Sequence, residues 1–321
     1  MAVLTLTDQM TALEVAKRSG FSEDSRRIIE ELNQFNELLI DAPVVEANEG
    51  TTDTHLVRTA IPHGQHRAYN EGVGQSSSQT KTIKDVLSNI EIYSTVDKQM
   101  IDESAHPKEL MQSEQNAFIE GLSQDITYDL IYGNHAADPR YTNGLATRRS
   151  SLGKYCLSMG GTGNALTSIY LIKWDMTKAR IIYPRGSKSA GIQYDYLGEQ
   201  TVKDSSGKEY QAYRAHYRIS RGLSVGHEAS IIRICNIDLN SHTGDAIAKK
   251  IVRAMPLLAK GGGTVSIACN AEVKGVMNEA SLSKTNIVLP AEDPWGNEVL
   301  KIGNARFREC PQILLTESAV S

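Results

Sequence analysis

Long hydrophobic runs, cysteine and aromatic side chains are all scarce in this 321-residue chain. No window approaches the run of about 18 apolar residues that a membrane-spanning helix needs, so we expect no membrane contact. The four cysteines lie far apart without a C-x-x-C pair, which argues against a disulfide framework and favours buried thiols in a reducing compartment. The N-terminal residues lack the pattern of a secretory signal. These absences predict a protein that is made and used in solution.

The sequence patterns of common catalytic sites are missing too. Neither a G-x-S-x-G elbow nor an H-E-x-x-H helix occurs. The glycines from Gly160 to Gly163 only partly match a dinucleotide-binding loop, because Leu166 stands at the third glycine position and no strand is expected before them. His63 and His66 have no cysteine or carboxylate nearby to complete a metal site, so surface histidines are favoured. We predict no catalytic, cofactor-binding or metal-binding residue.

Charge is distributed unevenly along the chain. The net charge is −4, but residues 1–50 hold ten acidic and four basic side chains. Residues 201–260 hold ten basic and five acidic side chains, which allows a locally basic surface, although a solvated face is favoured over a nucleic-acid site. Between Tyr210 and Arg221 tyrosines and arginines alternate, and a strand would place them on opposite faces. The length indicates about two domains.

The first fifty residues predict a helical arm. A short helix is expected from Thr7 or Asp8 to Arg18. A second helix is expected from about residue 22 to just before Pro43, where apolar residues recur at helical spacing. Its opposite face is acidic, so the helix should lie against a larger body, either its own or a neighbour's.

A polar ribbon of roughly forty residues follows the arm. Residues 54–61 predict a strand, residues 72–79 a loop tip, and residues 90–96 the returning strand. Each leg would span about 45 Å. An isolated two-stranded ribbon is marginal in water, so we expect another subunit to hold it.

One long helix is predicted from Pro107 to Gly133, about 40 Å in length. Gly121 in its interior suggests a close neighbour or a slight bend. Beyond the loop at residues 134–149 we expect a body with a mixed sheet. Its strands are predicted at 168–174, 179–183, 210–221, 230–235, 264–269 and 306–316, and its helix at 244–260. The fold class is therefore α+β.

This order of elements resembles the Hong Kong 97 fold of tailed-phage major capsid proteins. The individual segments are similar to those of epsilon 15 type podovirus capsid proteins. They are Arg58–Pro62, Arg67–Val73, Ile92–Asp97, Phe118–Leu122, Tyr132–Asn134, Asn143–Leu145, Arg306–Cys310 and Thr316–Glu317.

The resemblance implies a domain layout. The N-terminal arm would be residues 1–49 and the extended E-loop residues 50–88. The peripheral domain with its spine helix would be residues 89–150, completed by the return strand at 290–321, and the axial domain would be residues 151–289.

The resemblance also implies a function without enzymatic activity or cofactor. Hexameric and pentameric capsomers would assemble into an icosahedral shell around phage DNA, which would touch the inner surface without sequence specificity. Assembly would take place in the host cytoplasm, and the product would be the capsid of the virion. The other expected partners are a portal and a cement or decoration protein. A separate scaffolding protein is also expected, because the chain lacks room for a long cleavable N-terminal scaffolding segment.

The E-loop supplies the candidate contacts between subunits. Arg58, Arg67, Glu71, Lys81 and Lys84 are candidates for ion pairs across the interface, and for each one a solvated side chain is the alternative. Two rival functions remain open at this point. They are a non-viral shell of the encapsulin type and an α+β enzyme with an unrecognised site.

Overall fold

The computed structural model describes residues 37–104, 106–187, 191–282, 289–292 and 298–321. The chain forms two compact units. The large unit comprises Asn36–Ser88, Tyr128–Ser187 and Arg221–Ser321, and the described part of the small unit lies within Asn89–Thr127 and Lys188–Ser220. The boundaries fall inside one helix and two strands, so each of these elements contributes to both units. They are α3 (Pro107–Tyr132), β9 (Glu209–Val225) and β4 (Ser88–Asp97), of which only Ser88 belongs to the large unit.

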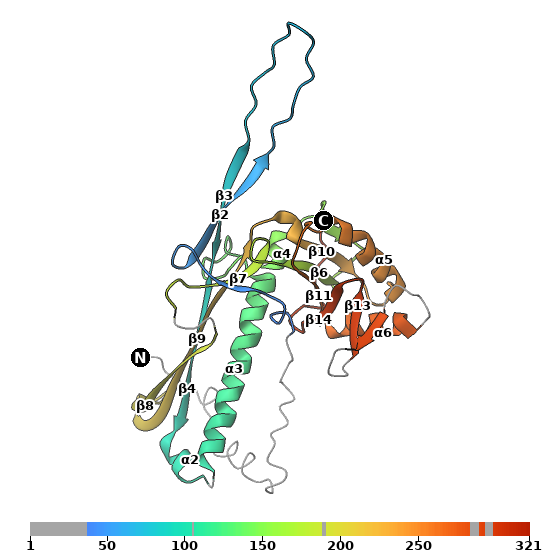
Figure 1. Ribbon diagram of the computed structural model, residues 1–321. Helices are drawn as coiled ribbons and strands as arrows, with labels where there is room; N and C mark the ends of the chain where they lie inside the picture. Colours follow the sequence, from blue (N-terminus) through green and yellow to red (C-terminus); the bar gives the residue numbers. More distant parts are fainter. Residues whose placement is uncertain (1–36, 105, 188–190, 283–288, 293–297) are drawn as a thin grey trace. The chain divides into compact units, whose positions relative to one another are not determined.

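The large unit is built on a mixed β-sheet (Figure 1). At its centre β6 (Thr167–Trp174) runs antiparallel to both β10 (Ile231–Ile237) and β11 (Thr264–Cys269). Beyond β11 the sheet continues through β14 (Ala305–Glu309), β13 (Glu298–Ile302) and β12 (Leu289–Glu292). Three further strands complete the sheet. β5 (Cys156–Ser158) lies parallel to β10, and β1 (Val44–Glu46) lies parallel to β7 (Ala179–Tyr183). β7 also pairs with the end of β9.

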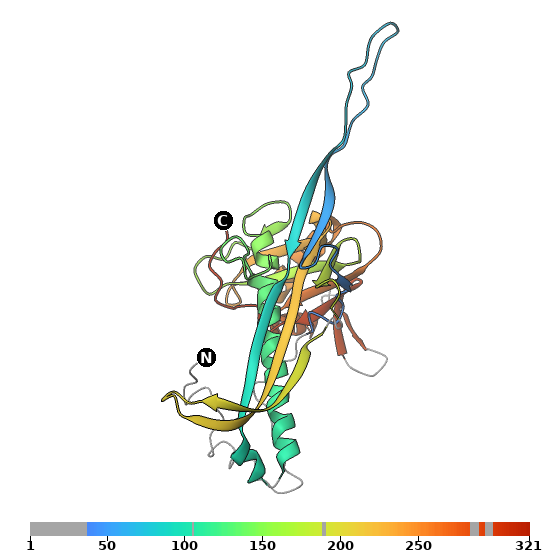
Figure 2. The ribbon, with the colours of Figure 1, turned by 90° about the vertical axis from the view of Figure 1, so that its left-hand side faces the viewer.

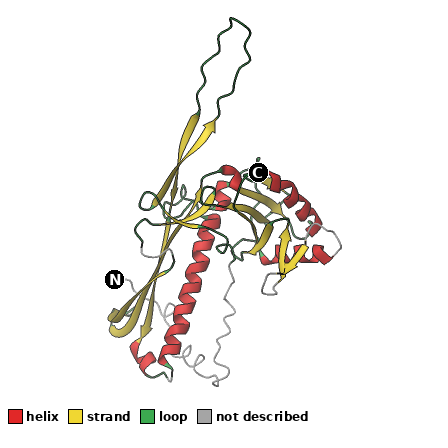
Figure 3. Cartoon of the chain, viewed as in Figure 1, coloured by secondary structure: helices red, strands yellow, loops and turns green. Residues whose placement is uncertain are grey.

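Both faces of this sheet are covered, which explains its continuous apolar strands. In β6 the side chains of Ile169 and Leu171 enter one core cluster, whereas Tyr170 and Ile172 enter the other. The first cluster is closed by α5 (Gly244–Ala254), η4 (Met255–Leu257) and α6 (Ala271–Leu282), two of which Figure 3 shows in red along the sheet. The second is closed by the end of α3 and by α4 (Leu145–Arg148). A short turn, η3 (Glu228–Ser230), precedes β10.

Two glycines shape the chain between α3 and α4. A Cβ on Gly133 would lie 2.5 Å from the backbone oxygen of Thr142, and a Cβ on Gly144 would lie 2.5 Å from that of Ile131. The backbone nitrogen of Gly144 donates to the backbone oxygen of Gly133 at 2.9 Å. Only residues without a side chain fit this close crossing. The Tyr-Gly-Asn and Asn-Gly-Leu motifs therefore bring α4 back against the end of α3.

A β-hairpin leaves the body of the large unit (Figures 1 and 2). β2 (Thr52–Ala60) pairs antiparallel with β3 (Gln79–Val86), and an exposed loop at residues 61–78 joins them. The predicted outgoing strand is confirmed. The loop tip predicted at 72–79 falls in the joining loop apart from Gln79, which begins β3. The predicted returning strand is wrong, because residues 90–96 belong to β4 (Ser88–Asp97), which pairs with β9. β3 holds few apolar residues, so its strand character comes from pairing with β2 and not from a hydrophobic pattern.

The small unit packs helices against a three-stranded sheet. β9 lies between β4 and β8 (Gln193–Lys203), and Figure 2 shows β4 and β9 side by side along α3. Leu122 and Ile126 of α3 are buried with Tyr217 of β9, and the rings of Phe118 and Tyr217 stack with centroids 5.5 Å apart. A second cluster includes Ile101 of α2 (Lys98–Asp102).

Most elements of the body were predicted correctly, and the differences have physical causes. The predicted helix at 244–260 ends at Ala254, where the chain continues as a tighter turn. The strand predicted at 306–316 ends at Glu309, before Pro311. The elements that were missed include α6 and the strands β1, β5, β8, β12 and β13. Residues 38–41 form turns and bends where the second arm helix was predicted, and the other predicted arm residues lie outside the described ranges. A Cβ on Gly121 would meet nothing in the described structure, so the close neighbour predicted there is not part of this chain's described residues.

Candidate assembly interface

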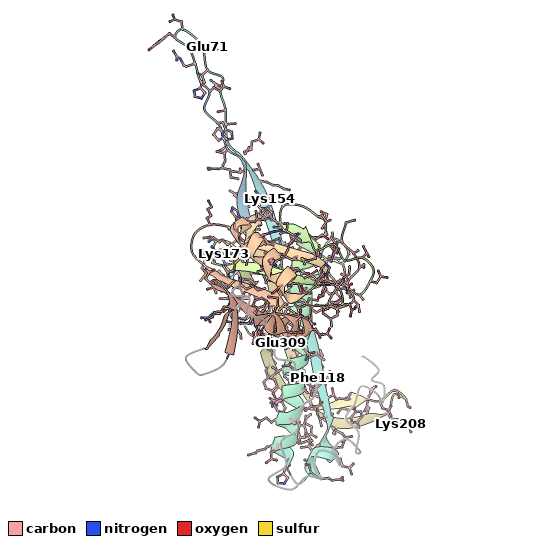
Figure 4. All side chains as sticks on the ribbon, turned by 90° about the vertical axis from the view of Figure 1, so that its right-hand side faces the viewer. Glu71, Phe118, Lys154, Lys173, Lys208 and Glu309 are labelled. Atoms are coloured by element: carbon pink, nitrogen blue, oxygen red, sulfur yellow. The ribbon has the colours of Figure 1, made fainter. Side chains whose placement is uncertain are left out.

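The hairpin exposes an unusual amount of apolar surface. The exposed fraction is 71% for Leu56, 68% for Ile61, 99% for Tyr69 and 50% for Val73. Large apolar side chains gathered on one projecting element mark a contact surface, because leaving them in water is unfavourable. Figure 4 shows Glu71 near the far end of the same hairpin.

Local hydrogen bonds shape the tip of the hairpin. Asn70 has a left-handed backbone conformation with φ 69°. The backbone nitrogen of Ala68 donates to the carboxylate of Glu71 at 2.9 Å, and the backbone nitrogen of Gly74 donates to the side-chain oxygen of Gln65 at 3.3 Å. Asn adopts this conformation more readily than most residues do. The turn presents Tyr69 almost completely to solvent.

The five predicted contact residues are all exposed, and the chain does not pair them with one another. Lys84 lies 3.8 Å from Glu49 of the same chain, and the Glu71 carboxylate holds the tip turn. Arg58, Arg67 and Lys81 have no charged partner among the residues that the structure describes. The exposed ribbon thus carries four basic side chains against one acidic one. Whether they pair across an interface stays a prediction.

Sequence analysis missed the residues that fix the base of the hairpin. Asp53 of β2 and Asp85 of β3 face each other in register, and they are only 2% and 1% exposed. Arg180 of β7 binds Asp53 and Arg148 of α4 binds Asp85, each at 2.6 Å. Neither acidic residue stands out in the sequence, since their partners lie more than sixty positions away.

These contacts determine the ionisation of Asp53. Burial by itself raises the pKa of this carboxyl group, because a charge is less stable away from water. Hydrogen bonds from Arg180 and Ser224, together with the charge of Arg180, outweigh burial and hold the pKa below its ordinary value. Asp53 is therefore a carboxylate at neutral pH, and the bond to Arg180 is charge-assisted.

A second buried network holds the C-terminal segment on the sheet. Arg233 of β10 binds Glu317 at 3.0 Å with both side chains 6% exposed. The hydroxyl of Tyr132 donates to Glu317 at 2.6 Å, and the hydroxyl of Ser168 also donates to this carboxylate. The Asn236 side chain binds both the backbone nitrogen and the backbone oxygen of Val320. The closing residues of the chain are therefore an integral part of the large unit.

The structure also shows where the cysteines, the glycines at 160–163 and the basic segment 201–260 lie. All four cysteines are buried free thiols, as predicted. The glycines at 160–163 follow a short strand, which was not expected, but β6 follows them where a dinucleotide-binding loop would need a helix. Tyr213 and Tyr217 face the small unit's core, whereas Arg214 stacks on Tyr93. The basic character of residues 201–260 is partly internal because Arg233 is buried.

His63 and His66 are exposed in the loop of the hairpin. Among the described residues, no group of His, Cys, Asp and Glu side chains could hold a metal ion. Within the same ranges, none of the helices combines the length and apolarity needed to cross a bilayer.

Solved structures define the class of this fold. A chain in a structure of bacteriophage Epsilon15 matches with a TM-score of 0.71 and 26% identity, covering 100% of this chain and 99% of that chain. The capsid of bacteriophage JBD30 matches with a TM-score of 0.52 and 10% identity, covering 97% of this chain and 99% of that chain, which shows the fold alone. The holo-SrpI encapsulin from Synechococcus elongatus reaches a TM-score of only 0.49 at 11% identity, with coverage of 73% and 99%, and supports no conclusion. The fold is the Hong Kong 97-like α+β fold of shell-forming capsid proteins.

The sequence comparison then gives the family. A family model described as major capsid protein GP7 matches residues 22–321 of the sequence. The chain therefore belongs to this family. Among curated proteins, none matches the chain. The protein is a phage major capsid protein of the epsilon15 type, which assembles with copies of itself into the capsid of the virion. This family is structural, not enzymatic.

Proposed function

We propose that the chain builds an icosahedral shell from hexameric and pentameric capsomers, with the hairpin as its main contact to the neighbouring copy. The observation that carries this proposal is the exposed apolar surface of Leu56, Ile61, Tyr69 and Val73 on an element with few stabilising contacts of its own. Burying one such side chain stabilises a contact by about 1.5–3 kcal/mol. When each copy makes the same contact with the next, the copies form a closed ring.

Charge supports the same arrangement. The exposed ribbon is basic through Arg58, Arg67, Lys81 and Lys84, whereas residues 1–50 of the sequence carry a net charge of −6. Opposite charges on two surfaces favour their association and suppress wrong pairings. On this proposal the acidic arm of one copy and the ribbon of another attract each other during assembly.

The capsid domains follow from the proposed arrangement. Residues 1–49 are the arm, 50–88 the E-loop, 89–150 with 290–321 the peripheral domain, and 151–289 the axial domain. The shell encloses double-stranded phage DNA without sequence specificity and is assembled in the host cytoplasm. A separate scaffolding protein, a portal and a cement protein are the proposed partners.

The test is assembly of full-length variants coexpressed with the phage's scaffolding protein. Tyr69→Ser combined with Leu56→Ser removes two exposed apolar side chains, and a large loss of closed particles in sucrose gradients and negative-stain images is expected. Tyr141→Ser is the matched control, because Tyr141 is an exposed tyrosine outside the hairpin. Normal particle yield from the hairpin variant would contradict the proposed contact.

A further inference from the structure

The hairpin base contains two buried carboxylates, one on each strand. Asp53 and Asp85 occupy opposed positions of the β2–β3 ladder and point into the body of the large unit. These two aspartates form hydrogen bonds with α4, β7 and β9, and the Nε2 of His55 lies 2.9 Å from the backbone oxygen of Val225 in β9. The side chains of Thr52 and Thr54 bind Glu49, just before β2. Beyond this base most residues of the two strands, and the loop that joins them, are exposed.

Each aspartate is bound by two different elements. Asp53 Oδ2 accepts from Arg180 Nη2 of β7 and from the hydroxyl of Ser224 of β9, both at 2.6 Å. Asp85 Oδ1 accepts from Arg148 Nη2 of α4 at 2.6 Å, and its Oδ2 accepts from the backbone nitrogen of Val225 at 3.1 Å. β2 is thus attached to β7 and β9, and β3 to α4 and β9.

The two arginines are themselves held in place. Arg148 also donates to the backbone oxygens of Asn143 at 3.0 Å and Leu223 at 2.9 Å, and Arg180 donates to the backbone oxygen of Met176 at 2.5 Å. Directional bonds to fixed donors define an angle more sharply than apolar contacts do. A buried ion pair is weak evidence for stability, so a role in specifying geometry is the better explanation of this cluster.

The length of the hairpin makes this angle important. At about 3.3 Å per residue, the chain from Asp53 to Asn70 reaches about 55 Å when extended, so a tilt of about 10° at the base moves the tip by about 10 Å. Such a displacement exceeds the width of a side chain. The tip would then miss the surface it has to meet.

We propose that Asp53 and Asp85 are positioning residues of the shell, which set the direction of the hairpin so that its tip meets the neighbouring copy. This inference depends on the proposed contact between hairpin and neighbour. On this inference Asp53 and Asp85 at the base set the direction of the hairpin, and the exposed apolar side chains nearer its tip make the contact. Variants of the two regions therefore separate the two proposals.

The first measurement is made on the unassembled full-length subunit. Spin labels at Thr82→Cys on β3 and Lys249→Cys on α5 lie on exposed positions of the same unit, while the four native thiols are buried. Double electron–electron resonance should give one narrow distance distribution. Asp53→Asn with Asp85→Asn should broaden it at unchanged far-ultraviolet circular dichroism. An unchanged distribution would overturn the inference.

The second measurement is assembly, with Asp138→Asn as the control because Asp138 forms an exposed ion pair in another loop of the large unit. The double variant should reduce particle yield by about 10- to 100-fold, the factor for losing a hydrogen bond to a charged group. If the double variant does not fold, the single variants Asp53→Asn and Asp85→Asn are measured in the same two ways. A broadened distribution with normal assembly would overturn the positioning role. Normal assembly of the Tyr69 and Leu56 variant would instead refute the proposed contact, while the distance measurement would still report whether the two aspartates fix the direction of the hairpin.

Discussion

At the residue scale, the buried charges of the large unit are the most sensitive positions. Arg233 and Glu317 lie 84 positions apart in the chain and have almost no exposure to water. A buried charge that loses its partner has no compensating interaction. Removing one member should therefore cost more than the pair itself contributes.

Glu317→Gln keeps the shape of the side chain and removes its charge. We expect the free energy of unfolding to fall by about 3–5 kcal/mol, because Arg233 would remain buried and uncompensated. Urea unfolding of the unassembled subunit, followed by fluorescence, measures the change. Glu209→Gln is the matched control, since Glu209 forms an exposed pair with Lys203 and should show no measurable effect. A loss as small as the control's would contradict this account.

At the element scale, the hairpin differs from the elements around it. The sheet and α3 are stabilised by apolar cores within their units, whereas the hairpin depends on polar contacts at its base. Its attachment should therefore respond to pH more strongly than the core does. Asp53 is the group for which the direction of this response follows from the structure.

The contribution of Asp53 should disappear in acid. Its pKa in the folded protein lies below the value of about 3.9 for an unfolded chain, so its stabilisation is complete above about pH 4 and is lost as the pH falls through the folded value. We expect the difference in free energy of unfolding between the wild type and Asp53→Asn to be constant at higher pH and to shrink below about pH 4. Urea titrations over that range measure it. A difference that grows in acid would show that the sign is wrong.

Sequence reasoning succeeded for elements whose signal is local. α3, β6, β10 and β11 were predicted because each carries its own apolar periodicity or run. β3 and β8 were missed because their polar residues form strands only by pairing with β2 and β9. The residues of the candidate assembly interface were also predicted only in part. The exposed ribbon residues were found, whereas Asp53 and Asp85 were not, because their arginines lie on distant elements.

At the scale of the whole molecule, one chain carries segments of opposite charge. Arg58 and Lys81 stand on neighbouring positions of the exposed hairpin, and the N-terminal fifty residues are acidic in sequence. Identical copies can therefore attract one another through unlike regions. Contacts of this kind are head-to-tail, and they close into a ring when the rotation from one copy to the next completes a full turn.

Reversing the charges of the hairpin should hinder assembly without unfolding the subunit. For Arg58→Glu with Lys81→Glu we expect a several-fold higher concentration of subunit at the onset of assembly, because attraction becomes repulsion. The effect should be smaller at about 1 M salt, where charges are screened within about 3 Å. Light scattering measures the onset. Lys208→Glu, in an exposed turn of the small unit, is the control, and equal behaviour of the two variants would contradict a specific role of the hairpin.

The amino-acid sequence by itself determined the α+β class, the long helix, the central strands and the outgoing strand of a polar ribbon, and it led to the capsid family. Each of these follows from residues close together in the chain. Tertiary structure alone decided which strand pairs with β2, how Gly133 and Gly144 bring Arg148 to Asp85, and how Glu317 meets Arg233. The physical reason is that strand register and buried ion pairs depend on groups far apart in sequence, which only the folded chain brings within hydrogen-bonding distance.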